Sequence, residues 1–200
     1  MNKKIAIVGA GGHGKVVGEI ALLNNYKTID FFDDYILSSD NKFPFPILGN
    51  CKDLKNNLQY YDDCFIAIGE NKIRYEIMTK LIRLKAHFVN LIHPTSTISQ
   101  YSNLDKGICV MANAAINPGT TIGEGVIINT STSVDHDCFV EDYAKISPGC
   151  TLSGNVRVGK LTHIGTGSSV HPGIVIGSNV KIGVGSSIFK NIENNKVFKN

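Results

Sequence analysis

The sequence predicts a small α/β domain over residues 1–90, Rossmann-like in its βαβ order, followed by a left-handed parallel β-helix over residues 91–200. Two observations carry this prediction. An aliphatic residue recurs at every sixth position through the second half of the chain. The first half lacks this period, and short β-branched runs there alternate with helical patterns. A fixed short period indicates a repeat architecture, whereas strands that alternate with helices indicate a parallel sheet.

The first half is expected to form a small parallel sheet covered by helices. Strands are predicted over residues 3–8, 28–32, 64–68 and 87–92. Helices are predicted from the glycine-rich turn to about Leu23 and over residues 71–85, where apolar residues recur at helical spacing. The last strand is expected to lead into the first coil of the β-helix.

A glycine-rich turn follows the first predicted strand. Gly9, Gly11 and Gly14 have the spacing of the dinucleotide-binding fingerprint. Glycines let main-chain amides approach a phosphate, and a helix N-terminus favours negative charge. Ninety residues hold too few strands for a full dinucleotide fold, so a single pyrophosphate, as in a nucleotide sugar, suits this domain better than a nicotinamide cofactor. The alternative is a turn that only packs the helix onto the strand.

The second half has a strict period of six residues. Seventeen successive positions of this series are Leu, Ile or Val, namely residues 92, 98, 104, 110, 116, 122, 128, 134, 140, 146, 152, 158, 164, 170, 176, 182 and 188. Four residues beyond each of them a small or β-branched residue follows in nearly every repeat. A helix or an alternating strand has a different period, but a three-sided coil with one hexapeptide per side fits. Such coils stack about 4.8 Å apart, with the aliphatic side chains inside.

Composition and charge narrow the class of protein. The formal net charge is only +3 and basic residues form no run, which argues against nucleic-acid binding. No segment approaches the roughly 18 apolar residues of a membrane span, and the first apolar run is broken by glycines, so export is not expected. The five cysteines are odd in number and include no C-x-x-C pair, which favours reduced thiols in the cytoplasm and argues against a zinc site.

Among the six histidines, His136 is the candidate for chemistry. The inward positions of its hexad belong to Val134 and Cys138, so its side chain should point outward. Asp135 and Asp137 flank it, and a carboxylate on one ring nitrogen raises the basicity of the other. An exposed surface histidine is the alternative. His13 lies in the glycine turn, where it either contacts a phosphate or is passive. Structural roles are expected for His87 and His93, and His163 and His171 are expected on sides of the β-helix, facing solvent or a neighbour.

The whole chain resembles the sugar N-acetyltransferases of the bacillosamine (PglD-like) group, within a wider set that includes the sialic acid O-acetyltransferases (NeuD-like). The resemblance rests on an ordered set of motifs: Gly9-Ala10-Gly11-Gly12-His13-Gly14-Lys15, Phe32-Asp33-Asp34, residues 65–71 with Arg74, Val89-Asn90-Leu91-Ile92-His93-Pro94, and Asn129-Thr130-Ser131 through His136-Asp137.

The resemblance implies an acetyl-CoA-dependent, metal-free transfer to the amino group of a nucleotide-linked sugar, with a 4-amino-4,6-dideoxy sugar as the expected acceptor, in bacterial surface glycan synthesis. It implies a homotrimer with acetyl-CoA between two β-helices. His136 would be the base, supported by Asp137 and Asn129. Acetyl-CoA would contact Gly154, whose amide binds the thioester carbonyl, together with Lys145, Gly165 and Thr166. The nucleotide sugar would contact Gly11, Gly12, His13, Gly14, Asp33, Asp34, Gly69 and Asn71.

Two departures from the family pattern stand out. Lys145 replaces a second active-site histidine, and the chain ends without the usual Gly-x-Pro-Ala-Lys tail. Three alternatives stay open at this point. They are O-acetylation of a sialic acid or another sugar hydroxyl, a metal-dependent β-helix enzyme of the γ-carbonic anhydrase type, for which no close pair of histidines is present, and a non-catalytic scaffold or NAD-binding regulator.

Overall fold

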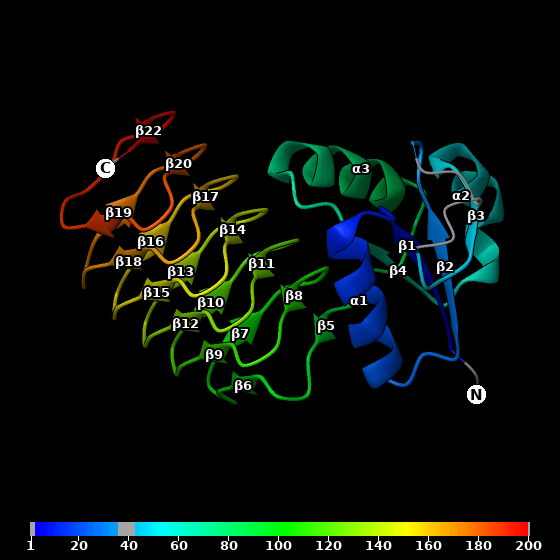
Figure 1. Ribbon diagram of the computed structural model, residues 1–200, viewed down its shortest axis with the longest axis horizontal. Helices are drawn as coiled ribbons and strands as arrows, with labels where there is room; N and C mark the ends of the chain where they lie inside the picture. The colour runs from blue at the N-terminus through cyan, green and yellow to red at the C-terminus, as the bar shows by residue number, and fades with distance from the viewer. Residues whose placement is uncertain (1–2, 36–42, 200) are drawn as a thin grey trace. The chain divides into compact units, whose positions relative to one another are not determined.

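The computed structural model describes residues 3–35 and 43–199. The chain divides into two compact units, an N-terminal unit that ends at Leu91 and a C-terminal unit that begins at Ile92. The boundary predicted from the sequence lies one residue earlier, after residue 90. Figure 1 shows helices with a small sheet in the first unit and stacked coils in the second.

The N-terminal unit is built around a four-stranded sheet with the order β3-β2-β1-β4, in which all strand pairs are parallel. The strands are β1 (Lys4–Val8), β2 (Thr28–Phe32), β3 (Ile47–Gly49) and β4 (Asp63–Ile66), and the helices are α1 (Gly12–Leu23), α2 (Cys51–Asn57), the 3-10 turn η1 (Leu58–Tyr60) and α3 (Asn71–Arg83). The chain moves outward from β1 through β2 to β3 and then returns to the other side of β1 as β4. In open parallel sheets, ligands bind at the carboxyl ends of strands beside such a reversal.

Three elements of this unit, β3, α2 and η1, were not predicted, and one predicted strand is nearly absent. Helix α2 begins at a capping box in which Asn50 and Asp53 exchange hydrogen bonds with each other's main-chain amides. This Asn-x-x-Asp pattern is the sequence signal for the helix start. Over residues 87–90 there is only a single bridge, between Phe88 and Cys64. Leu91 and Ile92 instead form the first strand of the next sheet.

The C-terminal unit is the left-handed parallel β-helix predicted from the six-residue period. Its two-residue strands form three parallel sheets, here called the seven-stranded face (β22-β20-β17-β14-β11-β8-β5), the six-stranded face (β21-β18-β15-β12-β9-β6) and the five-stranded face (β19-β16-β13-β10-β7). Almost every partner lies eighteen residues away, as Ser133 does from Thr151. The strands are Leu91–Ile92, Thr97–Ile98, Asn103–Leu104, Cys109–Val110, Ala115–Ile116, Thr121–Ile122, Ile127–Ile128, Ser133–Val134, Phe139–Val140, Lys145–Ile146, Thr151–Leu152, Arg157–Val158, His163–Ile164, Ser169–Val170, Val175–Ile176, Lys181–Ile182, Ser187–Ile188 and Val197–Phe198 for β5 to β22.

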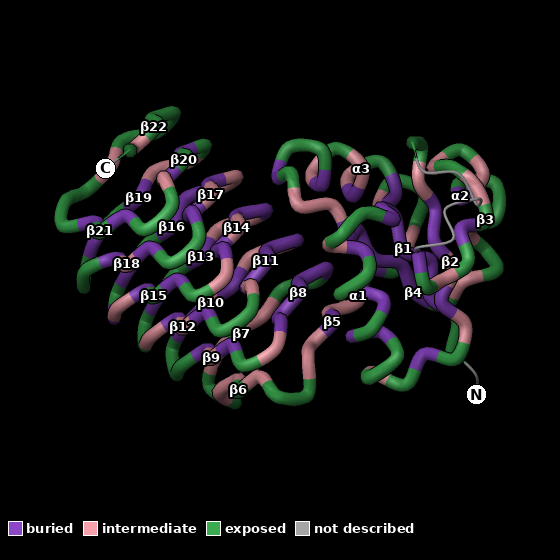
Figure 2. Tube along the Cα trace, in the orientation of Figure 1, coloured by how far each residue is buried: buried purple, intermediate pink, exposed green. Residues whose placement is uncertain are grey.

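The predicted aliphatic series forms the core of the coils. From Val110 to Ile188 each member of the series is at most 4% exposed, and the first three members pack against this core from partly buried positions. Figure 2 shows buried and exposed positions alternating along each coil. Because every coil supplies one aliphatic side chain per face, the apolar stack runs through the unit and stabilises it by removing apolar surface from water.

Turns stack along the edges of the β-helix as the strands do along its faces. The 135–137 edge, between the six-stranded and five-stranded faces, includes residues 99–101, 117–119, 135–137, 153–155 and 171–173. The 129–131 edge, between the seven-stranded and six-stranded faces, includes residues 93–95, 111–113, 129–131, 147–149, 165–167 and 183–185. Hydrogen bonds such as Asn155 N to His136 O, 3.0 Å, join one turn to the next.

Candidate active site

His136 projects from the middle of a tight turn on the 135–137 edge. Val134 and Cys138 on either side of this turn are 0% and 1% exposed, whereas the His136 side chain is 54% exposed. The next residue, Asp137, has a left-handed φ of 58°, a conformation that aspartate tolerates better than most residues. The alternation of inward and outward positions therefore presents the imidazole to solvent.

Asp137 orients the His136 ring. Its Oδ2 lies 2.8 Å from His136 Nδ1. A carboxylate only accepts hydrogen bonds, so Nδ1 carries the proton and Nε2 is left to act as a base. The hydrogen bond to Asp137 raises the pKa of His136 above 6.5, and the negative charges of Asp135 and Asp137 act in the same direction.

Gly154 lies beside the other nitrogen of this ring, one coil further along the same edge. A methyl group added to its α-carbon would lie 2.5 Å from His136 Nε2, so only glycine leaves room for the imidazole. Within the described ranges, no main-chain acceptor takes the Gly154 amide, although its neighbours Asn155 and Ser153 both donate to other coils. A residue whose amide has no main-chain acceptor among the described residues thus lies beside Nε2, the ring nitrogen that is left to act as a base.

Cys138 is the nearest thiol in sequence to His136, and it is unsuited to be a nucleophile. The residue is 1% exposed, and its Sγ donates to the Ser153 carbonyl at 3.2 Å. Burial raises the pKa of the thiol. A buried, protonated thiol is unreactive, because the thiolate is the nucleophilic form.

Asn129, predicted to support the base, and the predicted acetyl-CoA contacts other than Gly154 lie away from His136 within one chain. Asn129, Gly165 and Thr166 belong to the 129–131 edge, and the width of the six-stranded face separates this edge from His136. The Asn129 Oδ1 accepts from the Thr130 amide at 2.8 Å. Lys145 lies on the seven-stranded face in register with His163. One chain thus brings together His136, Asp137 and Gly154 and keeps the other four residues on a different edge or face.

Four other histidines each contact a neighbouring side chain or main-chain group. His163 Nε2 lies 2.9 Å from Ser147 Oγ, and the His171 ring packs on Phe189 at 4.4 Å between centroids. His93 Nδ1 accepts from the Thr95 amide at 3.1 Å. His87 Nδ1 lies 2.6 Å from the buried carboxylate of Asp63, which also accepts from Tyr26.

The glycines of the N-terminal turn fall into two groups. Gly9 has a φ of 107° and faces the Ala67 carbonyl, and a side chain at Gly14 would collide with the Gly9 carbonyl. Packing therefore accounts for these two. At Gly11 and Gly12 an added methyl group would meet nothing within 4 Å, and φ is not left-handed at either. The space in front of the first turn of α1, where His13 is half-buried, is open to a ligand.

Asp33 and Asp34 shape the carboxyl ends of β1 and β2. Asp33 accepts from the Ala10 amide at 2.8 Å through one oxygen and from the Tyr35 amide at 2.8 Å through the other. Asp34 accepts from the Cys51 amide at 2.8 Å. Both carboxylates line a hollow of about 130 Å³, whose other walls are Val8, Gly9, Tyr35, Cys51, Ile68, Ile73 and Ile77. This hollow lies where a parallel sheet places its ligands.

Gly69 and Asn71 follow β4 at the same end of the sheet. Asn71 is 6% exposed, and its Oδ1 accepts from Arg74 at 2.9 Å. Arg74 is 1% exposed and also donates to the Ile68 carbonyl. Arg74 thus fixes the start of α3 from inside, which leaves the main chain of residues 69–70 at the surface beside the hollow.

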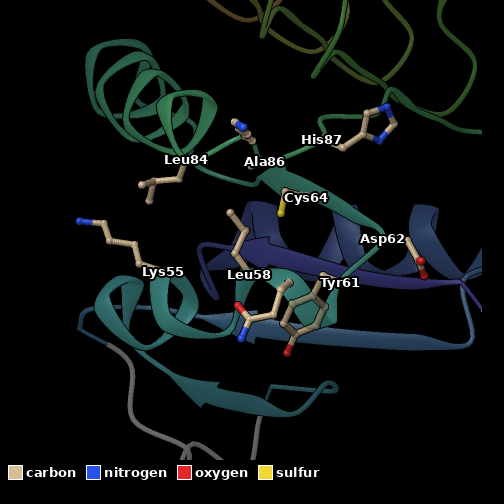
Figure 3. Close-up of a pocket in the computed structure, with 10 residues that line it drawn as sticks. Lys55, Leu58, Tyr61, Asp62, Cys64, Leu84, Ala86 and His87 are labelled. Atoms are coloured by element: carbon tan, nitrogen blue, oxygen red, sulfur yellow. The ribbon is translucent and has the colours of Figure 1, made fainter.

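A larger hollow, of about 420 Å³, lies near the amino end of β4 and contains none of the predicted site residues. Figure 3 shows Leu84 and Lys55 at one side of this hollow, one above the other, and Leu58 and Cys64 beside them nearer its middle. Among the residues that the structure describes, none forms a group of three or more His, Cys, Asp or Glu side chains able to hold a metal ion. No helix in the same set is long and apolar enough to cross a membrane.

Comparisons with known proteins agree with this architecture. Residues 4–81 match the PglD N-terminal domain family. The UDP-N-acetylbacillosamine N-acetyltransferase of Bacillus subtilis strain 168 is 35% identical over 113 residues, which are 55% of this chain and 52% of that protein. The matched region thus spans about half the length of this curated relative.

Solved structures match over nearly the full chain. The acetyltransferase domain of PglB from Neisseria gonorrhoeae FA1090, in complex with acetyl coenzyme A, has 40% sequence identity and a TM-score of 0.93, and the match covers 98% of this chain and 96% of that one. PerB from Caulobacter crescentus, in complex with CoA and GDP-perosamine, has 31% identity and a TM-score of 0.91, with 98% and 94% covered. The chain therefore belongs to the PglD/NeuD-like family of sugar acetyltransferases.

Proposed function

We propose that this protein transfers the acetyl group of acetyl-CoA to the amino group of a nucleotide-linked amino sugar, with His136 as the general base. The observation that carries the proposal is the environment of one imidazole. Asp137 occupies its Nδ1 at 2.8 Å, and Gly154, whose amide has no main-chain acceptor among the described residues, lies beside its Nε2. A base and an oxyanion donor are the two groups that acyl transfer from a thioester requires.

In the proposed reaction His136 Nε2 takes a proton from the sugar amine as the nitrogen attacks the thioester carbonyl carbon. The C–N bond forms, the Gly154 amide donates to the carbonyl oxygen as negative charge develops there, and the C–S bond then breaks to release the thiol of CoA. Asp137 stabilises the imidazolium throughout. Direct transfer, without an acyl-enzyme, is favoured because the nearby Cys138 thiol is buried and its pKa is raised.

The N-terminal unit would bind the nucleotide part of the acceptor. The open space before Gly11 and Gly12 at the start of α1 suits a pyrophosphate, because a helix N-terminus attracts anions. The hollow beside Asp33 and Asp34 would take the nucleoside end. The curated relative is named for a nucleotide-linked amino sugar and PerB was solved in complex with another, GDP-perosamine, which supports a 4-amino-4,6-dideoxy sugar as acceptor. We place the reaction in the cytoplasm, in bacterial surface glycan synthesis, as the family resemblance implies.

A homotrimer would account for the separation of the predicted residues. Asn129, Gly165 and Thr166 lie on the 129–131 edge, whereas His136 and Gly154 lie on the 135–137 edge. Two neighbouring copies that meet edge to edge would join the two groups in one cleft, with acetyl-CoA between them. Sedimentation or light scattering tests this part of the proposal, and an active monomer would contradict it.

The activity is tested by following free thiol release from acetyl-CoA with UDP-, dTDP- and GDP-linked 4-amino sugars as acceptors. His136→Asn is expected to lower turnover by about 10²- to 10⁴-fold without a change in fold. His171→Asn, on the same edge two coils further on, is the matched control and should keep activity. Near-wild-type turnover in His136→Asn, or an acetylated hydroxyl in place of the amine, would contradict the proposal.

A further inference from the structure

The Asp135 carboxylate binds the main-chain amide of His136, and the Asn117 side chain in turn binds this carboxylate. Its Oδ1 accepts from the His136 amide at 2.8 Å and from Asn117 Nδ2 at 2.9 Å. These contacts lower the pKa of the Asp135 carboxyl, with the hydrogen bond from Asn117 as the largest cause. Asp135 is therefore ionised at neutral pH and held between two donors.

The preceding coil positions both carboxylates that flank the imidazole. Asn117 holds Asp135 from one side of the turn. Gly119, on the other side, faces Asp137, and any side chain there would collide with the Asp137 carboxylate that binds the ring. The Asp137 amide also donates to Pro118 O at 3.1 Å. One turn of the chain, residues 117–119, thus serves as the template for the turn that bears His136.

A separate contact, from the Thr120 hydroxyl, holds the inner side of the turn that bears His136. The Thr120 hydroxyl donates to the Asp135 carbonyl at 2.7 Å and accepts from the Cys138 amide at 3.2 Å. Thr162 makes the equivalent pair of bonds, to Gly177 O and from Val180 N, at an edge without a candidate base. The hydroxyl contact is therefore a general feature of the coils, whereas the Asn117–Asp135 contact is added at the turn that presents the imidazole.

We propose that Asp135 is a positioning residue for His136, and that Asn117 acts through Asp135 by fixing its carboxylate. This inference rests on the proposed function, in which His136 is the general base. The Cα of His136 is anchored by its own amide through Asp135, and the ring is anchored by Asp137. With both anchors present, the imidazole is held in one orientation, in which Nε2 lies close to the α-carbon of Gly154.

The two roles of Asp135, contact and charge, can be separated by substitution. Asp135→Asn keeps an oxygen that can accept from the His136 amide but removes the charge. Asp135→Ala removes both. Because a base displaced by about 1 Å can lose a hundredfold in rate, Asp135→Ala should lower kcat by about ten- to a hundredfold while the KM for acetyl-CoA changes little. Asp135→Asn should lower kcat less and shift the acid limb of the pH profile to lower pH.

A double-mutant cycle tests whether Asn117 acts on His136 only through Asp135. Asn117→Ala is expected to lower kcat several-fold in the wild-type background and to have no further effect in Asp135→Ala. The matched control is Asp105→Ala, since Asp105 Oδ1 accepts from the next amide, Lys106 N, at 2.8 Å in the same way but far along the chain from the base. It should show the same small change in melting temperature as Asp135→Ala and keep wild-type kcat.

Three outcomes overturn the inference. One is an Asp135→Ala enzyme with wild-type kcat and an unshifted pH profile, while His136→Asn is inactive; the base assignment then stands and the positioning role fails. Another is an equal loss of kcat in Asp105→Ala, which would make the effect structural. The third is additive loss in the Asn117→Ala, Asp135→Ala double variant. If His136→Asn itself is active, the proposed function fails first, and the inference falls with it.

Discussion

The α-carbon of Gly154 faces Nε2 of His136 so closely that an added methyl group would lie 2.5 Å from this nitrogen. The base and the donor amide come from successive coils, so the rise of the β-helix sets their separation. The stacking of coils that builds the core therefore also brings the His136 imidazole and Gly154 together.

Gly154→Ala is expected to displace the imidazole and lower kcat by about a hundredfold, because the methyl group would lie only 2.5 Å from Nε2 and clash with the ring. The fold should be retained, since the colliding group is the end of a partly exposed side chain. Steady-state kinetics and a thermal melt measure the two effects. Gly183→Ala, where the nearest atom would be an ordinary 3.4 Å away, is the control and should change neither.

The pH profile should report the ionisation of His136. The base acts when neutral, and its pKa is raised above 6.5 chiefly by the hydrogen bond to Asp137. Turnover should therefore rise with pH through a value above 6.5. In Asp137→Asn this limb should move to lower pH while the plateau rate falls. NMR titration of the imidazole checks the shift, and an upward movement of the limb would contradict the assignment.

The pairing of His136 with Asp137 also predicts the direction in which the stability of the fold changes with pH. A group whose pKa is higher in the folded than in the unfolded state stabilises the fold fully at pH values below its pKa in the unfolded state. This stabilisation is lost as the pH rises through the pKa of the folded state. The difference in melting temperature between wild type and Asp137→Asn should accordingly be larger at pH 5.5 than at pH 8.5. A difference that grows with pH would be inconsistent with a raised pKa.

Gly14→Ala and Gly12→Ala should separate packing from binding in the glycine turn. Gly14→Ala places a methyl group on the Gly9 carbonyl and should destabilise the protein by about 1–3 kcal/mol. Gly12→Ala meets nothing within 4 Å, so the fold should be unaffected, but KM for the nucleotide sugar should rise. Chemical denaturation and kinetics give the two readouts. An unchanged KM in Gly12→Ala would indicate that the glycine turn only packs the helix onto the strand and does not bind the nucleotide sugar.

Thr120→Val and Thr162→Val remove equivalent pairs of buried hydrogen bonds from two turns. Each should cost about 1–3 kcal/mol, because a carbonyl and an amide lose their partner inside the coil. Only Thr120→Val should also lower kcat, since its turn carries His136. Equal losses of activity in the two variants would indicate that the coils respond as a whole.

Much of the fold follows from the sequence because the repeat is strict. The aliphatic series fixes which residues point inward, and from this the outward position of His136 follows directly. Strand β3 and helix α2 were missed because they are short, and the capping box of Asn50 and Asp53 was the available signal. The predicted strand over 87–92 is wrong in extent, since only Phe88 pairs with β4.

The site is harder to predict than the fold, because its geometry depends on contacts between coils. The partnership of Asn117 with Asp135 spans eighteen residues and is visible in the sequence only once the coil length is known. The separation of Asn129 from His136 has the same origin, since seven residues along the chain carry it to a different edge. The contacts of each predicted residue with substrate stay predictions.

The eighteen-residue register also limits how this chain can change in length. Removing one hexapeptide between His136 and Gly154 would move every later side chain onto the neighbouring face, and a residue of another edge would then arrive beneath the imidazole. Whole coils can be gained or lost only outside this pair, and extra segments must loop out at a turn and rejoin in phase. Working relatives should therefore differ in length at turns or by complete coils, while the spacing between base and donor amide stays constant.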